Sequence, residues 1–547
     1  MRFQRAPGQA PHSPWGAAPS LAGGGKGSPP GDDPGGRQGG SARGRRGGGL
    51  PCDPAETGRE EGDGSRRVRP GSQAPRGGGL FLERKERGKV SKSKPQAASW
   101  ARREAHRVLC AWSGNERRTQ LRPLLQRTAD RAAVHQREKG LFWQIVLGVV
   151  RSFRLLDALI KASAKKGIPG PGALRQALRI GLYQLLYLDR VPARAAVDQS
   201  VRLVEGRKAK ALVNAILRRA ADSITEGGEV EDPLSQVALP GGRLLSFSEP
   251  FLPDPEKRKL AYLAVFYSYP DFLVRKWTAR WGEERTRELL EAGNTTPPLN
   301  LRVNPLRATP EEVAEALGRE GVEGIREGAR PGTFQVDFTG NPARLEVLKK
   351  GWVTVQDQAA MRAVEVLDPK PGQRVLDLCA APGGKTTQAA ELMGDRGEIV
   401  AWDIEPRRLE RVARAVERLG LTSVKVARGA SLEEILARGP YDRVLADVPC
   451  TSTGVLARRP EGRWKLKAQD YKKLPALQRE ILAQAARAVA PGGVLVYSTC
   501  SLEEEENERV VETLEGWEIM LMETTLPQAG VRDGSFVARL EKKEEPS

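Results

Sequence analysis

Short, continuous apolar runs alternate with amphipathic helical stretches in the C-terminal third of the chain. This alternation constrains the fold more than any other feature. The apolar runs are "RVLDLC", "GEIVAWD", "YDRVLADVPC" and "GGVLVYSTC", and helical patterns such as "RLERVARAVERLG" separate them. Strands that alternate with helices form a doubly wound, mostly parallel sheet. We therefore predict an α/β, Rossmann-like domain over residues 354–541.

Chemically useful residues come at the ends of these predicted strands. The tight loop "AAPGGK" follows the strand that holds Asp377, and Asp403 ends the next strand. Asp447 and Cys450 close a third strand, and Cys500 ends the last one. In open α/β sheets, ligands bind at the carboxyl ends of the strands. The sequence thus predicts an active site at this edge of the sheet.

The Gly-rich loop has two interpretations. "GGKTT" is similar to the end of a phosphate-binding P-loop, but Cys379 stands where that motif has its first glycine. The second interpretation is a nucleoside-binding loop, because Gly383 and Gly384 let the backbone approach a ligand closely. Asp403 lies about 20 residues further on, where an acid can hold ribose hydroxyls. We favour the nucleoside-binding loop.

Composition and periodicity divide the rest of the chain. Residues 1–97 are rich in Gly, Pro and Arg, which predicts a disordered tail, and translation could begin near Val90. Apolar residues recur at helical spacing over residues 98–225, which predicts an all-α bundle with basic faces. Residues 226–253 are predicted to be a linker, and residues 254–353 a small α+β connecting domain.

The chain carries 88 Lys and Arg against 69 Asp and Glu, a net charge of +19. Such an excess favours a polyanionic partner, most simply a nucleic acid. No segment is long and apolar enough to span a bilayer, and no secretory signal is evident. The five cysteines are scattered without a CxxC pair, which predicts reduced thiols in the cytoplasm and no metal site.

Three motifs in order, "DLCAAPGGKTTQ", "DVPCTSTG" and "YSTCS", closely resemble those of S-adenosylmethionine-dependent RNA cytosine-5 methyltransferases. The stretches "LRIGLYQLLYLDRVPARAAVDQSVRLV" and "LVNAILRR" resemble the NusB-type RNA-binding domain, and "LRVN" resembles the connecting domain of these enzymes. Over most of its length past Ala98, the chain is similar to the Sun/RsmB family of ribosomal RNA methyltransferases.

The resemblance implies a reaction and a set of residues. S-adenosyl-L-methionine would methylate C5 of a cytosine in 16S, small-subunit ribosomal RNA through a covalent Cys–C6 adduct. Cys500 would be the nucleophile, Cys450 would assist adduct breakdown and release, and Asp447 would contact N3. In DNA methyltransferases the Pro-Cys cysteine attacks instead, which would nominate Cys450. The implied cofactor-binding residues are Cys379, Ala380, Ala381, Pro382, Gly383, Gly384, Lys385, Asp403 and Asp447. The candidate RNA-binding residues are Arg103, Arg151, Arg218, Arg302, Arg458 and Arg459.

The chain departs from the family pattern in two places. Ala430 stands where an acid normally meets the adenine, and Gln358 and Ala360 replace an acid and a serine in "VQDQAA". The acidic run Glu503 to Glu506 is interpreted as the solvated start of a helix, where negative charge suits the N-terminus. We expect these acids to do no chemistry.

Two other functions remain open at this point. One is a transfer RNA cytosine-5 methyltransferase, which the catalytic motifs alone do not exclude. The other is a non-catalytic, NusB-type RNA-binding adaptor, against which intact Asp447, Cys450 and Cys500 argue. The NusB-like region favours ribosomal RNA as the partner, and we expect a cytoplasmic monomer that needs no membrane.

Overall fold

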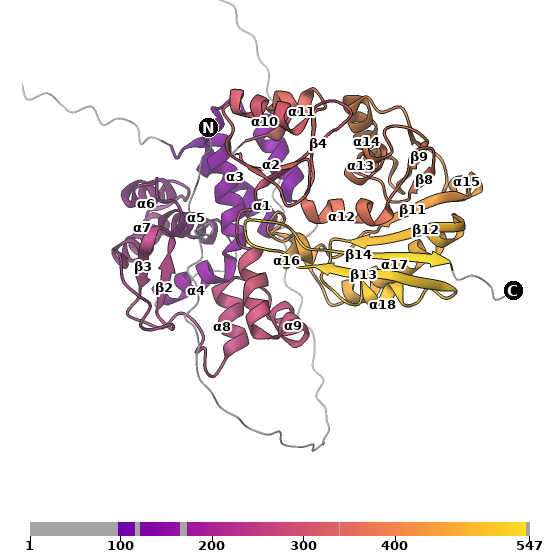
Figure 1. Cartoon of the computed structure of the whole chain (residues 1–547). Helices are drawn as coiled ribbons and strands as arrows, with labels where there is room; N and C mark the ends of the chain where they lie inside the picture. Colours follow the sequence, from indigo (N-terminus) through magenta and orange to yellow (C-terminus); the bar gives the residue numbers. More distant parts are fainter. Residues whose placement is uncertain (1–96, 115–120, 165–171, 339, 543–547) are drawn as a thin grey trace, which may run out of the picture. The chain divides into compact units, whose positions relative to one another are not determined.

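A computed structural model describes residues 97–114, 121–164, 172–338 and 340–542, and all of them belong to one unit (Figure 1). The predicted disordered tail lies outside the described residues except for Ala97, and so does the hypothetical start near Val90. Among the helices described, none combines the length and apolar character that crossing a membrane requires.

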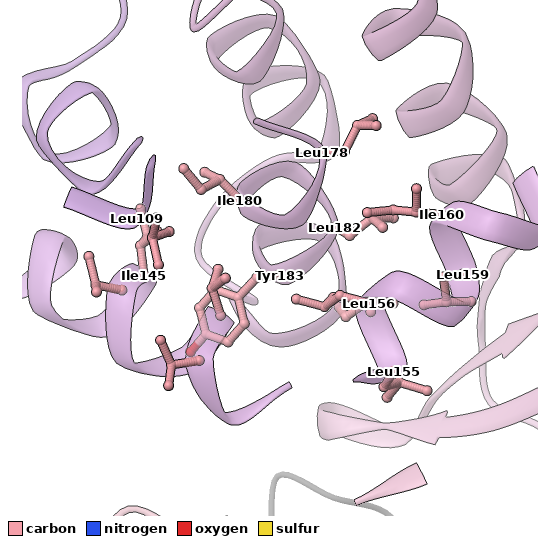
Figure 2. Close-up of a cluster of buried hydrophobic side chains, with 14 of the residues drawn as sticks. Leu109, Ile145, Leu155, Leu156, Leu159, Ile160, Leu178, Ile180, Leu182 and Tyr183 are labelled. Carbon is pink, nitrogen blue, oxygen red and sulfur yellow. The ribbon is translucent and has the colours of Figure 1, made fainter. Parts of the chain in front are cut away.

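Helices fill the first described part of the chain, as the apolar periodicity predicts. They are α1 (Trp100–Gly114), α2 (Leu121–Asp130), α3 (Gln136–Arg151), α4 (Phe153–Ser163), α5 (Ala173–Tyr187), α6 (Ala193–Val201) and α7 (Arg207–Asp222). Helix α5 is buried along most of its length. Figure 2 shows its side chains Leu178, Ile180 and Leu182 in one core with Leu109 of α1 and Ile145 of α3. The all-α prediction for this part is therefore confirmed.

The segment predicted to be a linker, residues 226–253, is instead largely a small antiparallel sheet, so that prediction was wrong. Its strand order is β1-β3-β2, and η1 (Pro240–Gly242) forms the turn between β2 and β3. The strands are β1 (Ile224–Glu226), β2 (Gln236–Leu239) and β3 (Arg243–Ser246). Leu239 and Leu245 are buried in the core of the bundle. The strands are too short for their alternation to stand out between glycines and prolines.

The connecting region has the predicted mixture of helices and strands. Helices α8 (Lys259–Phe266) and α9 (Asp271–Ala292) precede an antiparallel sheet with the order β5-β6-β4-β7. Its strands are β4 (Leu299–Val303), β5 (Glu323–Glu327), β6 (Thr333–Asp337) and β7 (Val353–Val355). The remaining elements are α10 (Pro310–Arg319), η2 (Pro342–Arg344) and α11 (Glu346–Lys349).

The C-terminal part is the predicted doubly wound sheet, with the order β10-β9-β8-β11-β12-β14-β13. The parallel strands are β8 (Arg374–Asp377), β9 (Glu398–Ala401), β10 (Val424–Val426), β11 (Tyr441–Asp447) and β12 (Val489–Thr499). The antiparallel strands β13 (Trp517–Thr525) and β14 (Ser535–Lys542) complete one edge beside β12 (Figure 1).

Two separate apolar cores cover the two faces of this sheet. One core takes side chains from α12, α13 and α14, and the other takes them from α15, α17 and α18. The helices of this part are α12 (Gln358–Leu367), α13 (Gly384–Leu392), α14 (Pro406–Leu419), α15 (Leu432–Ala437), α16 (Gly462–Lys465), α17 (Asp470–Arg487) and α18 (Glu508–Val511), with the short η3 (Thr453–Val455). Alternate residues of one strand, Val494 and Leu495, belong to different cores, as the period of two requires.

A buried ion pair joins the connecting sheet to the catalytic sheet. Arg302 of β4 donates through Nε and Nη2 to the two carboxylate oxygens of Glu391 in α13, at 2.9 Å each. A further bond, of 3.1 Å, runs from Arg302 Nη1 to the carbonyl of Gly384. The two charged side chains are only 8% and 3% exposed. Arg302 thus positions the helix that begins at the Gly-rich loop.

The segment that follows Cys450 packs against the helical bundle. Arg122 Nε of α2 donates to the carbonyl of Arg458 at 3.0 Å, and Arg151 Nη2 of α3 donates to that of Ala457 at 2.8 Å. Leu456 belongs to the same apolar core as the bundle. The bundle therefore satisfies backbone groups of a segment that begins at the predicted active site.

A second set of contacts extends this packing. Arg463 is fully buried, donates to Asn294 Oδ1 at 2.7 Å and lies 3.7 Å from the ring centre of Tyr269. Burial lowers the pKa of Arg463 to about 10. The neighbouring Trp464 donates its indole N–H to the carbonyl of Val150 at 2.8 Å.

We expect Arg302→Ala to lower the free energy of unfolding by roughly 3–5 kcal/mol, because it leaves Glu391 buried without its partner. Burial already raises the pKa of Glu391, so protonation relieves the defect. The loss should therefore be smaller at about pH 5 than at about pH 8. Urea unfolding at the two pH values measures both effects.

The matched control is Arg319→Ala, which breaks an ion pair with Glu315 on the surface of α10, where the side chains are 67% and 69% exposed. We expect that change to cost less than about 0.5 kcal/mol. Equal losses in the two variants would contradict a positioning role for Arg302.

Candidate active site

Cys450 and Cys500 lie side by side because they follow neighbouring parallel strands. β11 and β12 pair with Asp447 opposite Ser498, and Val448 N–H donates to the Ser498 carbonyl at 3.0 Å. The two chains then leave the sheet at the same edge, and the Sγ atoms of the cysteines are 3.2 Å apart. The structure thus brings together the residues that the strand-end argument selected.

The contact between the two thiols pushes their pKa values apart. The hydrogen bond from Cys450 lowers the pKa of Cys500 against the effect of burial, and the Ser452 hydroxyl, 3.4 Å away, lowers it further. The same contact and burial raise the pKa of Cys450 well above its usual value. Cys500 is therefore the thiol of the pair that ionises more readily, and Cys450 is the one that holds its proton more firmly. A thiolate is the nucleophilic form of cysteine.

The ion pair of Lys385 and Asp447 lies close to Cys500. Lys385, in the first turn of α13, donates from Nζ to Asp447 Oδ2 at 2.7 Å. Burial opposes the charge on Lys385, yet the carboxylate of Asp447 raises the pKa of this lysine overall. The ammonium also favours the charged form of Cys500. The site thus holds two thiols of different acidity and an ion pair in one half-buried cluster.

The loop between β8 and α13 forms a cradle with unused hydrogen-bonding capacity. Gly383 has a φ of +106°, and a Cβ there would meet Val412 Cα at 3.2 Å. Asp377 accepts from Thr386 Oγ1 at 2.6 Å, but its buried Oδ1 has no hydrogen-bond partner among the described residues. Burial raises the pKa of Asp377 to about 7. These features fit a ligand that brings hydrogen-bond donors.

Asp403 follows β9, which ends two residues earlier than predicted. The carboxylate is 3% exposed and accepts from Ala381 N–H at 3.3 Å, Glu405 N–H at 3.0 Å and Arg408 at 3.2 Å. It therefore lies against the Gly-rich loop. The third cysteine of the site, Cys379, is held neutral, because burial raises the pKa of its thiol.

The acidic run Glu503 to Glu506 does not begin a solvated helix, and that interpretation was wrong. Glu503 and Glu506 are almost fully buried in turns before α18. Glu506 accepts from Thr451 N–H at 2.9 Å, from Gln478 Nε2 at 3.0 Å and from the hydroxyls of Thr451 and Ser501. It ties the turn that carries Cys450 to the turn after Cys500. Composition alone predicts solvent exposure for such a run, whereas hydroxyl and amide partners far along the chain decide its burial.

Three of the arginines expected at RNA are engaged inside the protein. Arg302 is buried with Glu391, Arg151 holds the Ala457 carbonyl, and Arg458 binds Asp533 and Asp357 at 2.5 and 2.8 Å. Each of these guanidinium groups is already held by a partner inside the protein. These three arginines are therefore not retained as RNA contacts.

The other three arginines are exposed. Arg103 donates to the Ala98 carbonyl at 3.0 Å, and Arg218 lies on the outer face of α7. Arg459 directly follows the engaged Arg458. At the departures from the family pattern, Ala430 offers only its carbonyl, to Trp402 Nε1 at 2.8 Å.

Several residues of the site were not foreseen from the sequence. Ser452 lies in the motif "DVPCTSTG" but was given no role, Glu506 was assigned to a solvated helix start, and Asp377 was noted only as a strand end. Asp357 could have been found, because an Asp directly before "QAAMRAV" is a helix N-cap. It caps α12 and also accepts from Asn300 and Arg458, at 2.7 and 2.8 Å.

Asp377→Asn should remove a pH dependence of stability. The raised pKa means that the folded state binds a proton between about pH 4 and pH 7 that the unfolded state releases, so stability falls as the pH rises through this window. At about 1.4 kcal/mol per pKa unit, the effect reaches up to about 4 kcal/mol. Denaturant unfolding from pH 4 to pH 8 should show a flatter profile for the variant. Parallel profiles would contradict the assignment.

Comparisons with family models match three parts of the chain. Residues 364–526 match the family described as 16S rRNA methyltransferase RsmB/F. Residues 99–222 match the NusB family, and residues 269–336 match the RsmF/B-like ferredoxin-like domain.

Individual proteins are similar over most of the chain. The probable ribosomal RNA small subunit methyltransferase B of Synechocystis sp. is 36% identical over 431 residues, which are 73% of this chain and 90% of the relative. That of Klebsiella pneumoniae is 33% identical over 72% of this chain and 83% of the relative. The crystal structure of PH0851 superposes with a TM-score of 0.61 at 28% identity, over 81% of this chain and 98% of that one. The chain therefore belongs to the RsmB/F family of 16S rRNA methyltransferases.

Proposed function

We propose that the protein transfers a methyl group from S-adenosyl-L-methionine to C5 of a cytosine in small-subunit ribosomal RNA. The observation that carries this proposal is the close pair of thiols of Cys500 and Cys450 beside the Lys385–Asp447 ion pair. An adaptor that only binds RNA has no need of a thiol whose pKa is lowered by its neighbours. The relatives named as small-subunit ribosomal RNA methyltransferases support the RNA substrate.

The chemistry follows from the weak nucleophilicity of cytosine C5. When bound, S-adenosyl-L-methionine supplies an electrophilic methyl group. Addition of Cys500 Sγ to C6 makes C5 an enamine carbon that can take this methyl group, which is covalent catalysis. After methyl transfer a base must remove the C5 proton, and the Sγ–C6 bond breaks to return the thiolate of Cys500. Cys450 lies 3.2 Å from Cys500, so its thiol is placed to donate a hydrogen bond to the departing thiolate and assist release of the product.

Asp447 and Lys385 are proposed to stabilise the ring during addition. Electron density moves toward N3 when C6 is attacked, so a hydrogen bond at N3 lowers the barrier. The 2.7 Å contact between Lys385 and Asp447 keeps a proton next to this carboxylate. As C6 is attacked, this proton passes from Lys385 to Asp447, whose carboxylic acid donates it to N3, and Lys385 is left neutral.

The cradle after β8 is proposed to hold the cofactor. Gly383 and Gly384 leave room for the ligand, and Asp403 accepts from the ribose hydroxyls. The unpaired Oδ1 of Asp377 would accept from a further donor of the ligand. The loop residues Cys379, Ala380, Ala381 and Pro382 form the wall. With Ala430 in place of an acid, the adenine is held without a carboxylate.

Three exposed arginines are proposed to contact the RNA substrate. Arg103, Arg218 and Arg459 stay proposed RNA contacts, because they are exposed and belong to the bundle and to the segment after the catalytic turn. We propose a cytoplasmic monomer that uses no metal ion.

The two cysteines should give opposite results on a denaturing gel with small-subunit ribosomal RNA and cofactor. Cys500→Ala should abolish methyl transfer and form no covalent RNA adduct. Cys450→Ala should still attack but release slowly, which leaves a persistent shifted band. Cys110→Ala, in α1, is the matched cysteine control and should behave as the unmodified protein. A stable adduct in Cys500→Ala and none in Cys450→Ala would reverse the roles.

Asp403→Ala should weaken cofactor binding by roughly 1–3 kcal/mol, the cost of losing a buried, charged hydrogen bond. Titration calorimetry with S-adenosylhomocysteine measures the loss directly. The control is Asp395→Ala, because Asp395 accepts from Thr422 and Ser423 near the opposite end of β9. Unchanged affinity in Asp403→Ala would remove Asp403 from the cofactor site.

A further inference from the structure

A groove leads away from Cys450 between the helical bundle and the segment after the catalytic turn. Its volume is about 700 Å³. Cys450, Thr451 and Ser452 line it together with residues of α2, α3 and α14. The rest of the lining comes from residues 459–474. A chain bound in this groove would therefore pass beside Cys450.

The groove is strongly basic. Five cationic side chains line it against two acidic ones: Arg122, Arg127, Arg411, Arg459 and Lys465 against Glu461 and Asp470. Arg127, Arg411 and Arg459 are exposed and form no ion pair or side-chain hydrogen bond within the described part of the chain. Unneutralised arginines along a groove attract a polyanion.

A second hollow continues the same surface. It has a volume of about 310 Å³, lies between α1 and α2 and shares Arg127 with the groove. Arg107 is paired there with Glu104 at 2.6 Å, and Arg131 adds positive charge. Each hollow combines cations with one tryptophan, since Trp143 lines the first and Trp100 the second. This pattern is typical of surfaces that bind single-stranded nucleic acid, in which bases stack on aromatic rings.

We propose that the two hollows bind single-stranded RNA that flanks the target cytosine. Phosphates lie at Arg127, Arg411 and Arg459, and a base stacks on Trp143. The inference rests on the proposed RNA substrate and gives it a location and a strand state. An acidic polypeptide is the other ligand that such charge would accept. RNA is favoured because Cys450 lines the groove and because each hollow combines cations with a tryptophan on which a base can stack.

The probe is a fluorescent oligouridine of twelve nucleotides, bound to the full chain without cofactor. It lacks cytosine, so reaction at the cysteines does not confound binding. Arg127→Ala and Arg459→Ala should each weaken binding and lower the slope of log affinity against log salt by about 0.7, the value for one phosphate of a single strand. Arg190→Ala and Arg194→Ala are matched controls, since these exposed arginines line neither hollow and should leave the slope unchanged.

Trp143→Ala should weaken binding roughly tenfold without changing the salt slope, and Trp143→Phe should restore most of the affinity because it keeps a stacking ring. Thermal unfolding midpoints within a degree or so of the unmodified protein show that the variants fold. Unchanged affinity and slope in the Arg127→Ala/Arg459→Ala double variant would overturn the proposal. So would competition by polyglutamate as strong as that by unlabelled oligouridine, or equal binding of duplex RNA.

The test of RNA binding in the groove and the test of the methylation reaction can fail independently of each other. Binding through the groove without methylation of ribosomal RNA would leave the groove in place and remove the reaction. Methylation by variants whose RNA affinity and salt slope are unchanged would keep the reaction and remove the groove.

Discussion

The register between β11 and β12 is the constraint on which the whole site depends. Because the two strands are parallel neighbours with Asp447 opposite Ser498, the turns that follow them leave the sheet at one point. Slippage by one residue would turn every side chain of β12 to the other face of the sheet. Alternate residues of β12 belong to two separate apolar cores, so such a shift would disrupt both of them. The position of the two thiols is thereby fixed by hydrophobic packing some distance away.

Electrostatics then distinguishes two residues of the same type. Cys450 and Cys500 have similar strand-end positions, yet their shared hydrogen bond, Ser452 and Lys385 make Cys500 the more acidic thiol. Glu506 accepts from hydroxyl and amide partners of its own. Asp447 has its own donor in Lys385.

The sequence allowed the fold and the edge of the site to be predicted because both depend on local periodicity and on a topological rule. It did not allow us to predict which charged residues are buried, because contacts between distant parts of the chain decide this. Glu506 and Arg302 look like surface residues from composition, but partners far along the chain bury them. The two antiparallel edge strands were missed because "WEIMLMETT" mixes charged and apolar residues without clear alternation. Each error concerns a residue or segment whose environment is supplied by another part of the chain.

The hydrogen bonds from Arg122 and Arg151 to the carbonyls of Arg458 and Ala457 bear on how such a protein can change over evolution. They make the helical bundle part of the scaffold of the catalytic turn, with Leu456 buried in the bundle core. A bundle borrowed from a distant relative would bring a different surface and leave those carbonyls unpaired. Gene fusion could have joined the two modules once, but afterwards they must diverge together, each substitution on one side restricting which are tolerated on the other.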